Sequence, residues 1–219
     1  MSAGKIYAVL TGDLIGYSRF KPEDRERVLS VLKVAFGKLS PDMIASNFHI
    51  FRGDSFQGVL SMPDEALMAA LIIRSGLISG SSGKSHRIDT RIAIGLGTVD
   101  RLGKRAGEGD GEAFRNSGKG LDSMKKGDHN ITALTPWKEL NDELRAECAL
   151  LDALIMRWSM EQAEAVMYHI MGQTQEEIAR SLNISQPAVF QRLRMGGMRA
   201  IQEFLQRYRE TIKYNAGDL

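Results

Sequence analysis

The stretch YAVLTGDLIGYSRF, residues 7–20, places a Gly-Asp pair at positions 12–13, at the end of an apolar run. A second stretch, FHIFRGDSFQGVL at residues 48–60, places another Gly-Asp pair at positions 53–54. Both runs are rich in the aliphatic and aromatic residues that favour buried strands. Because a buried strand rarely holds a glycine or an unpaired carboxylate, the two pairs suggest a site at which two strands meet.

The segments around these stretches predict an α+β fold. We expect strands at residues 5–12, 47–52, 55–61 and 87–97, a helix from Pro22 to about Leu39, and a second helix that begins at Pro63. The resulting β-α-β-β-α-β order is the ferredoxin-like split unit. A helix over residues 112–126 and a short strand over residues 130–134 are added to this core.

The chain changes character after the last of these strands. No strand pattern follows it, and Thr135-Pro136 is a typical helix start, with Thr as the cap and Pro in the first position. We therefore predict an α/β domain over residues 1–135 and an all-helical domain over residues 136–219.

Asp13 and Asp54 are expected to face each other. In a β-α-β-β unit we place the first strand beside the second and third, so its end and the tip of the hairpin fall on one edge. Two close carboxylates repel each other unless a positive charge lies between them, and a divalent cation is the usual solution. A pair of such ions suits phosphoryl chemistry, and the adjacent glycines would let a triphosphate approach the backbone. Each aspartate taken alone is also explained as a turn residue.

The two stretches resemble the paired metal motifs of the class III nucleotidyl cyclase catalytic domain, which has a palm-type fold. The first motif reads Asp13-Leu14-Ile15-Gly16-Tyr17-Ser18 and the second Gly53-Asp54-Ser55-Phe56. The TGD opening is also similar to that of the SatD family of bacterial proteins. The resemblance covers roughly residues 5–134 and implies that two Mg²⁺ or Mn²⁺ ions are held by Asp13, Asp54 and the backbone carbonyl of Leu14. It also implies a nucleotide placed against Gly16, Tyr17, Ser18 and Gly53.

The other half of the cyclase site departs from the family pattern. The family's transition-state Asn and Arg positions hold Arg115 and Lys119, its purine-selecting Lys is replaced by Ile50, and its purine-selecting Asp corresponds to Glu108. Lys119 keeps the charge but lacks the bidentate fork, for which Arg115, one turn away on the same helix face, would compensate. Together with Asp13 and Asp54 these two residues are the catalytic candidates, although solvated side chains on an exposed helix explain them equally well.

The glycine-rich loop at residues 103–111 offers backbone N–H groups that would cradle a phosphate at the start of the following helix. A plain flexible loop accounts for the same glycines.

Residues 174–194, TQEEIARSLNISQPAVFQRLR, carry a helix-turn-helix pattern. Thr174 and Glu177 form a capping box, Asn183 occupies the turn where a left-handed residue is needed, and Ser185 caps the second helix. The segment closely resembles region 4 of bacterial sigma factors and related regulators. We expect DNA contacts from six residues: Thr174, Ser185, Gln186, Phe190, Gln191 and Arg194.

Local charge agrees with a DNA partner, because residues 174–213 contain seven Lys or Arg against four Glu. A helical hairpin that serves as a dimerisation module would use the same packing.

Composition excludes several protein classes. The net charge is only +2, so bulk charge indicates neither a nucleic-acid nor a membrane partner. No apolar run approaches the ~20 residues that a membrane-spanning helix needs. Cys148 is the only cysteine, which excludes a disulfide framework, and residues 1–13 reach a charge too early for a signal peptide. These features favour a cytoplasmic protein.

Three functions remain open from the sequence. The first is a DNA-binding regulator whose cyclase-like domain binds a nucleotide or a metal-phosphate ligand. The second is an active Mg²⁺- or Mn²⁺-dependent nucleotidyl cyclase, or a related nucleotidyltransferase, that acts on an NTP. The third is a degenerate cyclase fold used only for dimerisation. A homodimer is expected under all three.

Overall fold

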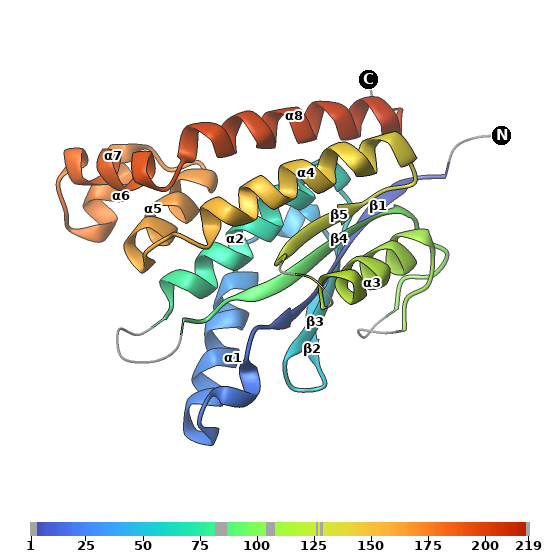
Figure 1. Ribbon diagram of the computed structural model, residues 1–219, viewed down its shortest axis with the longest axis horizontal. Helices are drawn as coiled ribbons and strands as arrows, with labels where there is room; N and C mark the ends of the chain where they lie inside the picture. The colour runs from blue at the N-terminus through green and yellow to red at the C-terminus, as the bar shows by residue number, and fades with distance from the viewer. Residues whose placement is uncertain (1–3, 82–86, 104–107, 126, 128, 218–219) are drawn as a thin grey trace.

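The computed structural model describes residues 4–81, 87–103, 108–125, 127 and 129–217. Five strands form one sheet in the order β2-β3-β1-β4-β5 (Figure 1). Their bounds are β1 Ile6–Leu14, β2 Ile44–Phe51, β3 Ser55–Leu60, β4 Thr90–Thr98 and β5 Ile131–Leu134. Only β4 and β5 run parallel, and the other neighbours are antiparallel. The predicted α+β class and its β-α-β-β-α-β order are confirmed.

Helices cover both faces of the sheet (Figure 1). Alternation along β1 sends Ala8 and Leu10 into the large core beneath α1 (Pro22–Phe36) and α2 (Ala66–Ser79), and sends Val9 to the opposite face. That opposite face is covered by α3 (Glu112–Met124), which packs so closely on β4 that a Cβ at Gly95 would lie 2.2 Å from the backbone N of Ser117. The sheet is therefore the middle layer of the α/β part.

The C-terminal helices pack onto α2 rather than apart from it. α4 (Lys138–Ile155), α5 (Met160–Ile170) and α8 (Met198–Ala216) all contribute side chains to the buried cluster that contains α2. Because α2 is enclosed by the sheet and these helices, every residue from Leu67 to Ile78 except Met68 is buried. The predicted boundary near residue 135 thus separates two topologies that share one core, and the division into two domains stays a prediction.

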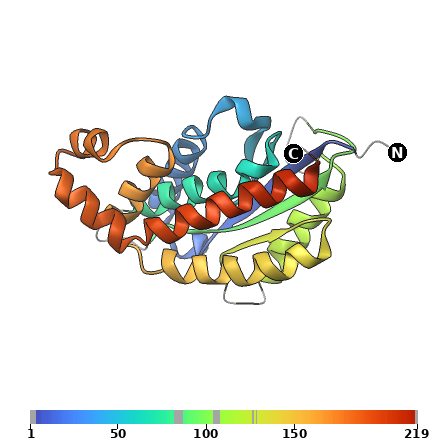
Figure 2. The same cartoon turned by 90° about the horizontal axis from the view of Figure 1, so that it is seen from above.

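The helix-turn-helix lies at one end of the molecule. α6 (Gln175–Leu182) and α7 (Gln186–Met195) follow α5, and α8 then runs back lengthwise beside α4 (Figures 1 and 2). Three contacts fasten α8 to the short helix η3 (Pro63–Glu65). The Tyr208 hydroxyl donates to the Pro63 carbonyl at 3.3 Å, Arg209 forms a bidentate pair with Glu65 at 2.9 Å, and Lys213 Nζ lies 3.4 Å from Asp64.

Three local predictions need correction. β1 lies between β3 and β4, so it is not a neighbour of β2, which forms the sheet edge. β1 also continues to Leu14, which places Asp13 inside the strand rather than after it. α4 begins at Lys138 with Trp137 in the cap position, because the Thr135 hydroxyl accepts the Trp137 N–H and donates to Asn141 instead of capping the helix.

Within the part of the chain that the structure describes, no helix has the length and apolar character that crossing a bilayer requires.

Candidate ligand site and nucleic-acid interface

The two Gly-Asp pairs meet at one edge of the sheet. Asp13 near the end of β1 lies opposite Ser55 at the start of β3, and the N–H of Leu14 donates to the carbonyl of Asp54 at 3.0 Å. The sequence predicts this convergence. It follows from β3 lying directly beside β1, so that the tip of the β2–β3 hairpin reaches the end of the first strand.

The glycines of the two pairs have different causes. A Cβ at Gly12 would lie 2.4 Å from the Phe56 ring and 2.5 Å from the Arg91 carbonyl, so packing alone requires glycine there. Gly53 has φ +86° and follows Arg52 at φ +52°, so the hairpin turn requires the left-handed region at both positions. Close approach of a phosphate is therefore not needed to explain either glycine.

The Asp13 carboxylate is compensated within the chain. One oxygen lies 3.2 Å from Arg91 Nη1 on β4, and the other lies 3.9 Å from Lys125 Nζ at the end of α3. The Asp13 side chain is only 11% exposed. Sequence reasoning missed both cations, although Arg91 stands out as a charge within an otherwise apolar strand.

This arrangement does not fit a pair of divalent cations as the residues lie. Both oxygens of Asp13 already face positive charges, and Asp54 accepts a long hydrogen bond of 3.4 Å from the Ser55 hydroxyl. The described residues contain no cluster of three or more His, Cys, Asp or Glu that could hold a metal ion. Mg²⁺ or Mn²⁺, and the metal roles of Asp13, Leu14 and Asp54, stay predictions.

Four of the five residues expected to receive a nucleotide lie at the same edge. Gly16 has φ +65° and precedes the short helix η1 (Tyr17–Arg19), and the Tyr17 ring lies 3.9 Å from a Cβ built at Gly53. The Ser18 carbonyl accepts a hydrogen bond from Arg25, whose guanidinium lies 5.6 Å from the centre of the Tyr17 ring. Gly16, Tyr17, Ser18 and Gly53 therefore lie beside the two aspartates.

Other candidates lie elsewhere. Arg115, near the start of α3, pairs with Asp110 at 3.0 Å, and its other terminal nitrogen lies 3.9 Å from Asp100. Glu108 lies against Gly103, beside the start of α3. Lys125, which faces Asp13, lies at the opposite end of that helix. Lys119 is exposed between the two ends. Within one chain the predicted catalytic set is thus not assembled, and residues 104–107 of the predicted phosphate loop lie outside the described residues.

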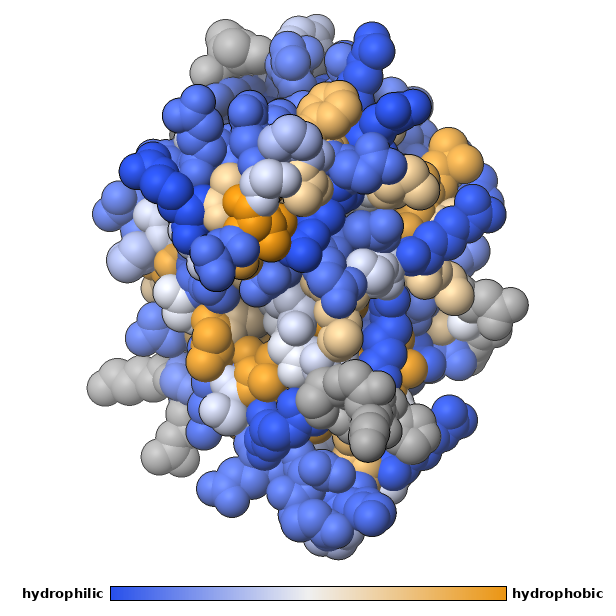
Figure 3. All heavy atoms as spheres, turned by 90° about the vertical axis from the view of Figure 1, so that its left-hand side faces the viewer, coloured by the Kyte–Doolittle hydropathy of each residue, from blue (hydrophilic) through white to orange (hydrophobic). Residues whose placement is uncertain are grey.

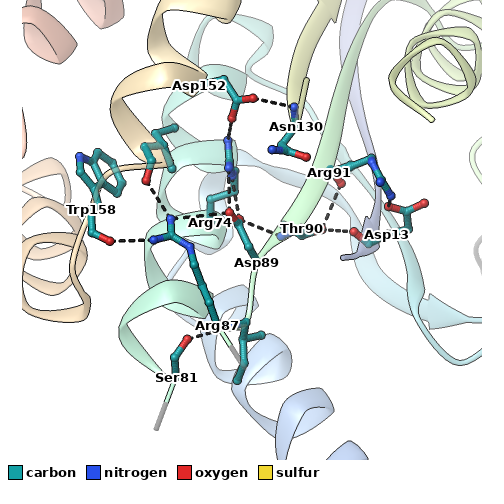
Figure 4. A network of polar contacts seen from close by, with 12 residues as sticks. Asp13, Arg74, Ser81, Arg87, Asp89, Thr90, Arg91, Asn130, Asp152 and Trp158 are labelled. Atoms are coloured by element: carbon teal, nitrogen blue, oxygen red, sulfur yellow. Dashed lines mark hydrogen bonds and ion pairs between the residues drawn. The ribbon is translucent and has the colours of Figure 1, made fainter. Parts of the chain in front are cut away.

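A buried polar cluster that the sequence did not reveal links the sheet to the C-terminal helices (Figure 4). Arg74 on α2 is fully buried, binds Asp89 through two hydrogen bonds of 2.9 Å, and reaches Asp152 on α4 at 2.6 Å. Burial alone would lower the pKa of Arg74, but the two carboxylates outweigh it and the pKa is raised. The one sequence signal is a lone arginine inside an apolar helix.

Cys148, on α4, is a free and buried thiol. It is 1% exposed, and burial raises its pKa to about 12, so that it stays protonated and unreactive at neutral pH.

The helix-turn-helix pattern forms two helices joined by a tight turn. The Thr174 hydroxyl accepts the Glu177 N–H while the Glu177 carboxylate accepts the Thr174 N–H, which completes the capping box. The Thr174 N–H and hydroxyl both donate to the Glu177 carboxylate, and these two hydrogen bonds lower the pKa of Glu177. Asn183 is left-handed at φ 52°, ψ 47°, and the Ser185 hydroxyl accepts the Ala188 N–H at 3.4 Å. The predicted caps and turn are confirmed.

The packing of this pair leaves one side of α7 facing outward. Ile178 on α6 and Val189 and Leu193 on α7 are buried. The residues expected to contact DNA are all exposed, and Phe190 reaches 53%: Thr174, Ser185, Gln186, Phe190, Gln191 and Arg194. The face of the molecule at this end is largely hydrophilic with separate hydrophobic spots (Figure 3). The side chains are thus free to meet a partner, and their role toward DNA stays a prediction.

No protein-family model and no curated protein matches the chain. Among solved structures, it is similar to the active GGEEF domain of a diguanylate cyclase from Vibrio cholerae, with TM-score 0.46 and 16% identity over 61% of this chain and 85% of that chain. A dimeric guanylyl cyclase domain of the RhoGC fusion protein from the aquatic fungus Blastocladiella emersonii gives TM-score 0.40 and 16% identity over 54% of this chain and 74% of that one. A bacterial light-regulated adenylyl cyclase gives 0.39 and 13% over 58% of this chain and 42% of that one. Because all three TM-scores lie below 0.5, the fold class rests on the strand order and register described above.

Proposed function

We infer that this chain is a DNA-binding regulator that reads DNA through α7. It also receives a phosphate-bearing ligand at the Asp13 edge, which is the edge of the sheet where Asp13 and Tyr17 meet the tip of the β2–β3 hairpin. The observation that carries the DNA half is the outward face of α7, where Gln186, Gln191 and Arg194 are exposed while Val189 and Leu193 on the opposite side are buried. Glutamine pairs with adenine edges in the major groove, and arginine pairs with guanine or with phosphate. Exposed Phe190 offers an apolar contact to a thymine methyl group.

The ligand half has support from the charges around Asp13. Arg91 and Lys125 bring two cations to the edge at which Tyr17 and the β2–β3 hairpin meet. An anionic phosphate would compete with the Asp13 carboxylate for these cations. A nucleotide is the ligand class that uses both the cations and the neighbouring aromatic ring. Two copies of the chain belong to the same proposal, since helix-turn-helix proteins commonly read two half-sites.

DNA binding is tested by selecting duplexes from a random pool and measuring affinity at several salt concentrations. Arg194→Ala is expected to weaken binding and to reduce by about 1 the slope of the logarithm of the binding constant against the logarithm of the salt concentration. Gln191→Ala is expected to relax the sequence preference at one base pair. Arg145→Ala, on the exposed face of α4, is the matched control and should leave affinity and slope unchanged. Binding that survives both α7 substitutions with the same slope would remove α7 as the reading helix.

The ligand is tested by thermal shift with ATP and GTP, each with and without Mn²⁺. A nucleotide at 100 times its Kd adds about 2.7 kcal/mol to the free energy of unfolding and raises Tm. Arg91→Met should abolish the shift, whereas Arg145→Met should preserve it. A shift that requires Mn²⁺ and is lost in Asp54→Asn supports the metal roles of the aspartates, and a shift without Mn²⁺ contradicts them. The same samples, searched for cyclic or linked products, test the enzyme alternative.

A further inference from the structure

Asp13 is bound to the start of β4 through both its backbone and its side chain. Its carbonyl accepts a hydrogen bond of 2.6 Å from the Thr90 hydroxyl, and its carboxylate lies 3.2 Å from Arg91 (Figure 4). The N–H of Thr90 in turn donates to the Asp89 carboxylate at 2.8 Å. Thr90 therefore holds Asp13 through its hydroxyl and Asp89 through its N–H.

Asp89 is shared by two arginines. Arg74 binds it through two hydrogen bonds, and Arg87 Nη2 lies 3.7 Å from its Oδ2. Arg74 also holds Asp152, whose second oxygen accepts the Asn130 N–H at 2.8 Å. The Asp89 and Asp152 side chains are 10% and 4% exposed, so neither can replace a lost partner with bulk water.

Arg87 carries the path onward to the end of α7. It donates to the carbonyls of Ile155 and Trp158 at 2.8 and 2.7 Å, which are at the end of α4 and in the turn before α5. The Trp158 indole N–H then donates to the Gly196 carbonyl at 2.9 Å, directly after the last residue of α7. An unbroken row of polar contacts therefore joins the Asp13 edge to the C-terminal end of the proposed reading helix.

In this row two arginines balance two aspartates, and three of these four side chains, Arg74, Asp89 and Asp152, lie where water is scarce. In such a low-dielectric setting a partner cannot be left behind without a large penalty, so displaced groups move together. Arg87 is the member with most room to move, because its side chain is 35% exposed.

We propose that this row of contacts, the Thr90–Trp158 path, couples the Asp13 edge to α7, so that an anion drawing Arg91 away from Asp13 repositions the reading helix. The coupling rests on the proposed function and names how its two halves communicate. In one state Arg91 pairs with Asp13. In the other, Arg91 pairs with the bound phosphate, the first residues of β4 shift, and Asp89, Arg87 and the Trp158–Gly196 bond follow.

The test is hydrogen exchange of the α7 amides, because this readout requires neither DNA nor ligand. Thr90→Val keeps the side-chain shape and removes the hydroxyl that donates to Asp13, and Trp158→Phe removes the N–H that donates to Gly196. Thr98→Val, at the other end of the same strand, is the matched control, and the α1 amides report any global loss of stability. We expect Thr90→Val to accelerate exchange in α7 with α1 unchanged, and Thr98→Val to leave α7 as in the parent chain.

The double variant Thr90→Val/Trp158→Phe decides whether one path carries the effect. When two distant sites act independently, the fold-change of the double variant equals the product of the two single fold-changes to within about twofold. If one path carries both effects, the fold-change in α7 exchange rate of the double variant should fall short of that product by more than about twofold. The proposal would be overturned if Thr90→Val left the α7 exchange rates unchanged. It would also be overturned if the fold-change of the double variant equalled the product of the two single fold-changes. If the parent chain binds no DNA while Thr90→Val still alters α7, the coupling stands and the proposed function fails; if DNA binding holds and α7 is unmoved, the reverse is true.

Discussion

At the Asp13 edge the chain pairs its own charges, whereas on α7 it leaves polar side chains facing outward. Asp13 meets Arg91 and Lys125, and in the neighbouring buried cluster Arg74 is enclosed between two carboxylates. Gln191 and Arg194 on α7, in contrast, are exposed. A region whose polar groups are already satisfied serves stability or internal communication, while a region with exposed polar groups on a firmly packed helix is suited to a partner.

Removal of Arg74 is expected to have the largest effect. Arg74→Met leaves Asp152 buried without its ion-pair partner and leaves Asp89 with only Arg87, 3.7 Å away, and breaking a buried pair of this kind costs about 3–5 kcal/mol in the free energy of unfolding. Urea denaturation measures the loss. Arg145→Met, which breaks a pair with Asp142 whose side chains are both 77% exposed, should change stability by at most about 0.5 kcal/mol. Similar losses for both variants would show that the interior and the surface do not differ as described.

A side chain at Gly12 should have the next largest effect. Gly12→Ala forces a methyl group to within 2.4 Å of the Phe56 ring and 2.5 Å of a backbone oxygen, and such overpacking costs about 1–3 kcal/mol. Gly118→Ala on α3 meets nothing within 4 Å and should instead stabilise the chain by up to about 1 kcal/mol through helix propensity. Thermal unfolding of both variants distinguishes the packed edge from the open helix surface. A neutral Gly12→Ala would mean that the edge has room for a ligand atom beside the strand.

Loss of the α7 cap should have the smallest effect. Ser185→Ala removes the hydroxyl that accepts the Ala188 N–H, at a cost of about 1 kcal/mol, whereas Ser185→Gly costs only a few tenths. Hydrogen exchange at the Ala188 and Val189 amides reports this local change. If Ser185→Ala leaves exchange there as in the parent chain, the hydroxyl is not a cap, and its exposure would be better explained by a contact made in a complex.

The helix-turn-helix could be predicted from sequence because its determinants are local. The capping box joins Thr174 to a residue three positions away, and Asn183 is one of the few residue types that readily adopt the left-handed conformation found there. The meeting of the two Gly-Asp pairs was also predictable, since the β-α-β-β order fixes which strand ends share an edge.

The charge compensation at the same edge was not predictable from sequence. Asp13 and Arg91 are separated by 78 positions, as are Arg74 and Asp152, and nothing in either neighbourhood specifies the partner. The strand error at Asp13 has a related cause: a charged residue normally signals the end of a buried strand, but here a cross-strand cation keeps it within the sheet. Partners distant in sequence decide both outcomes.

The anchoring of α8 has a consequence for the half-site spacing that a pair of chains would accept on DNA. α7 is followed after only two residues by α8, which Tyr208 and Arg209 fasten to η3, and α5 leads into the pair from the other side. The proposed reading helix α7 is therefore held between packed helices on both sides and does not hang from a flexible linker. If two copies of the chain bind DNA as proposed, the spacing between their α7 helices would be set by these packed supports and not by a flexible linker. An operator with one extra base pair between its halves, which turns one half by about a tenth of a revolution, would therefore be poorly tolerated.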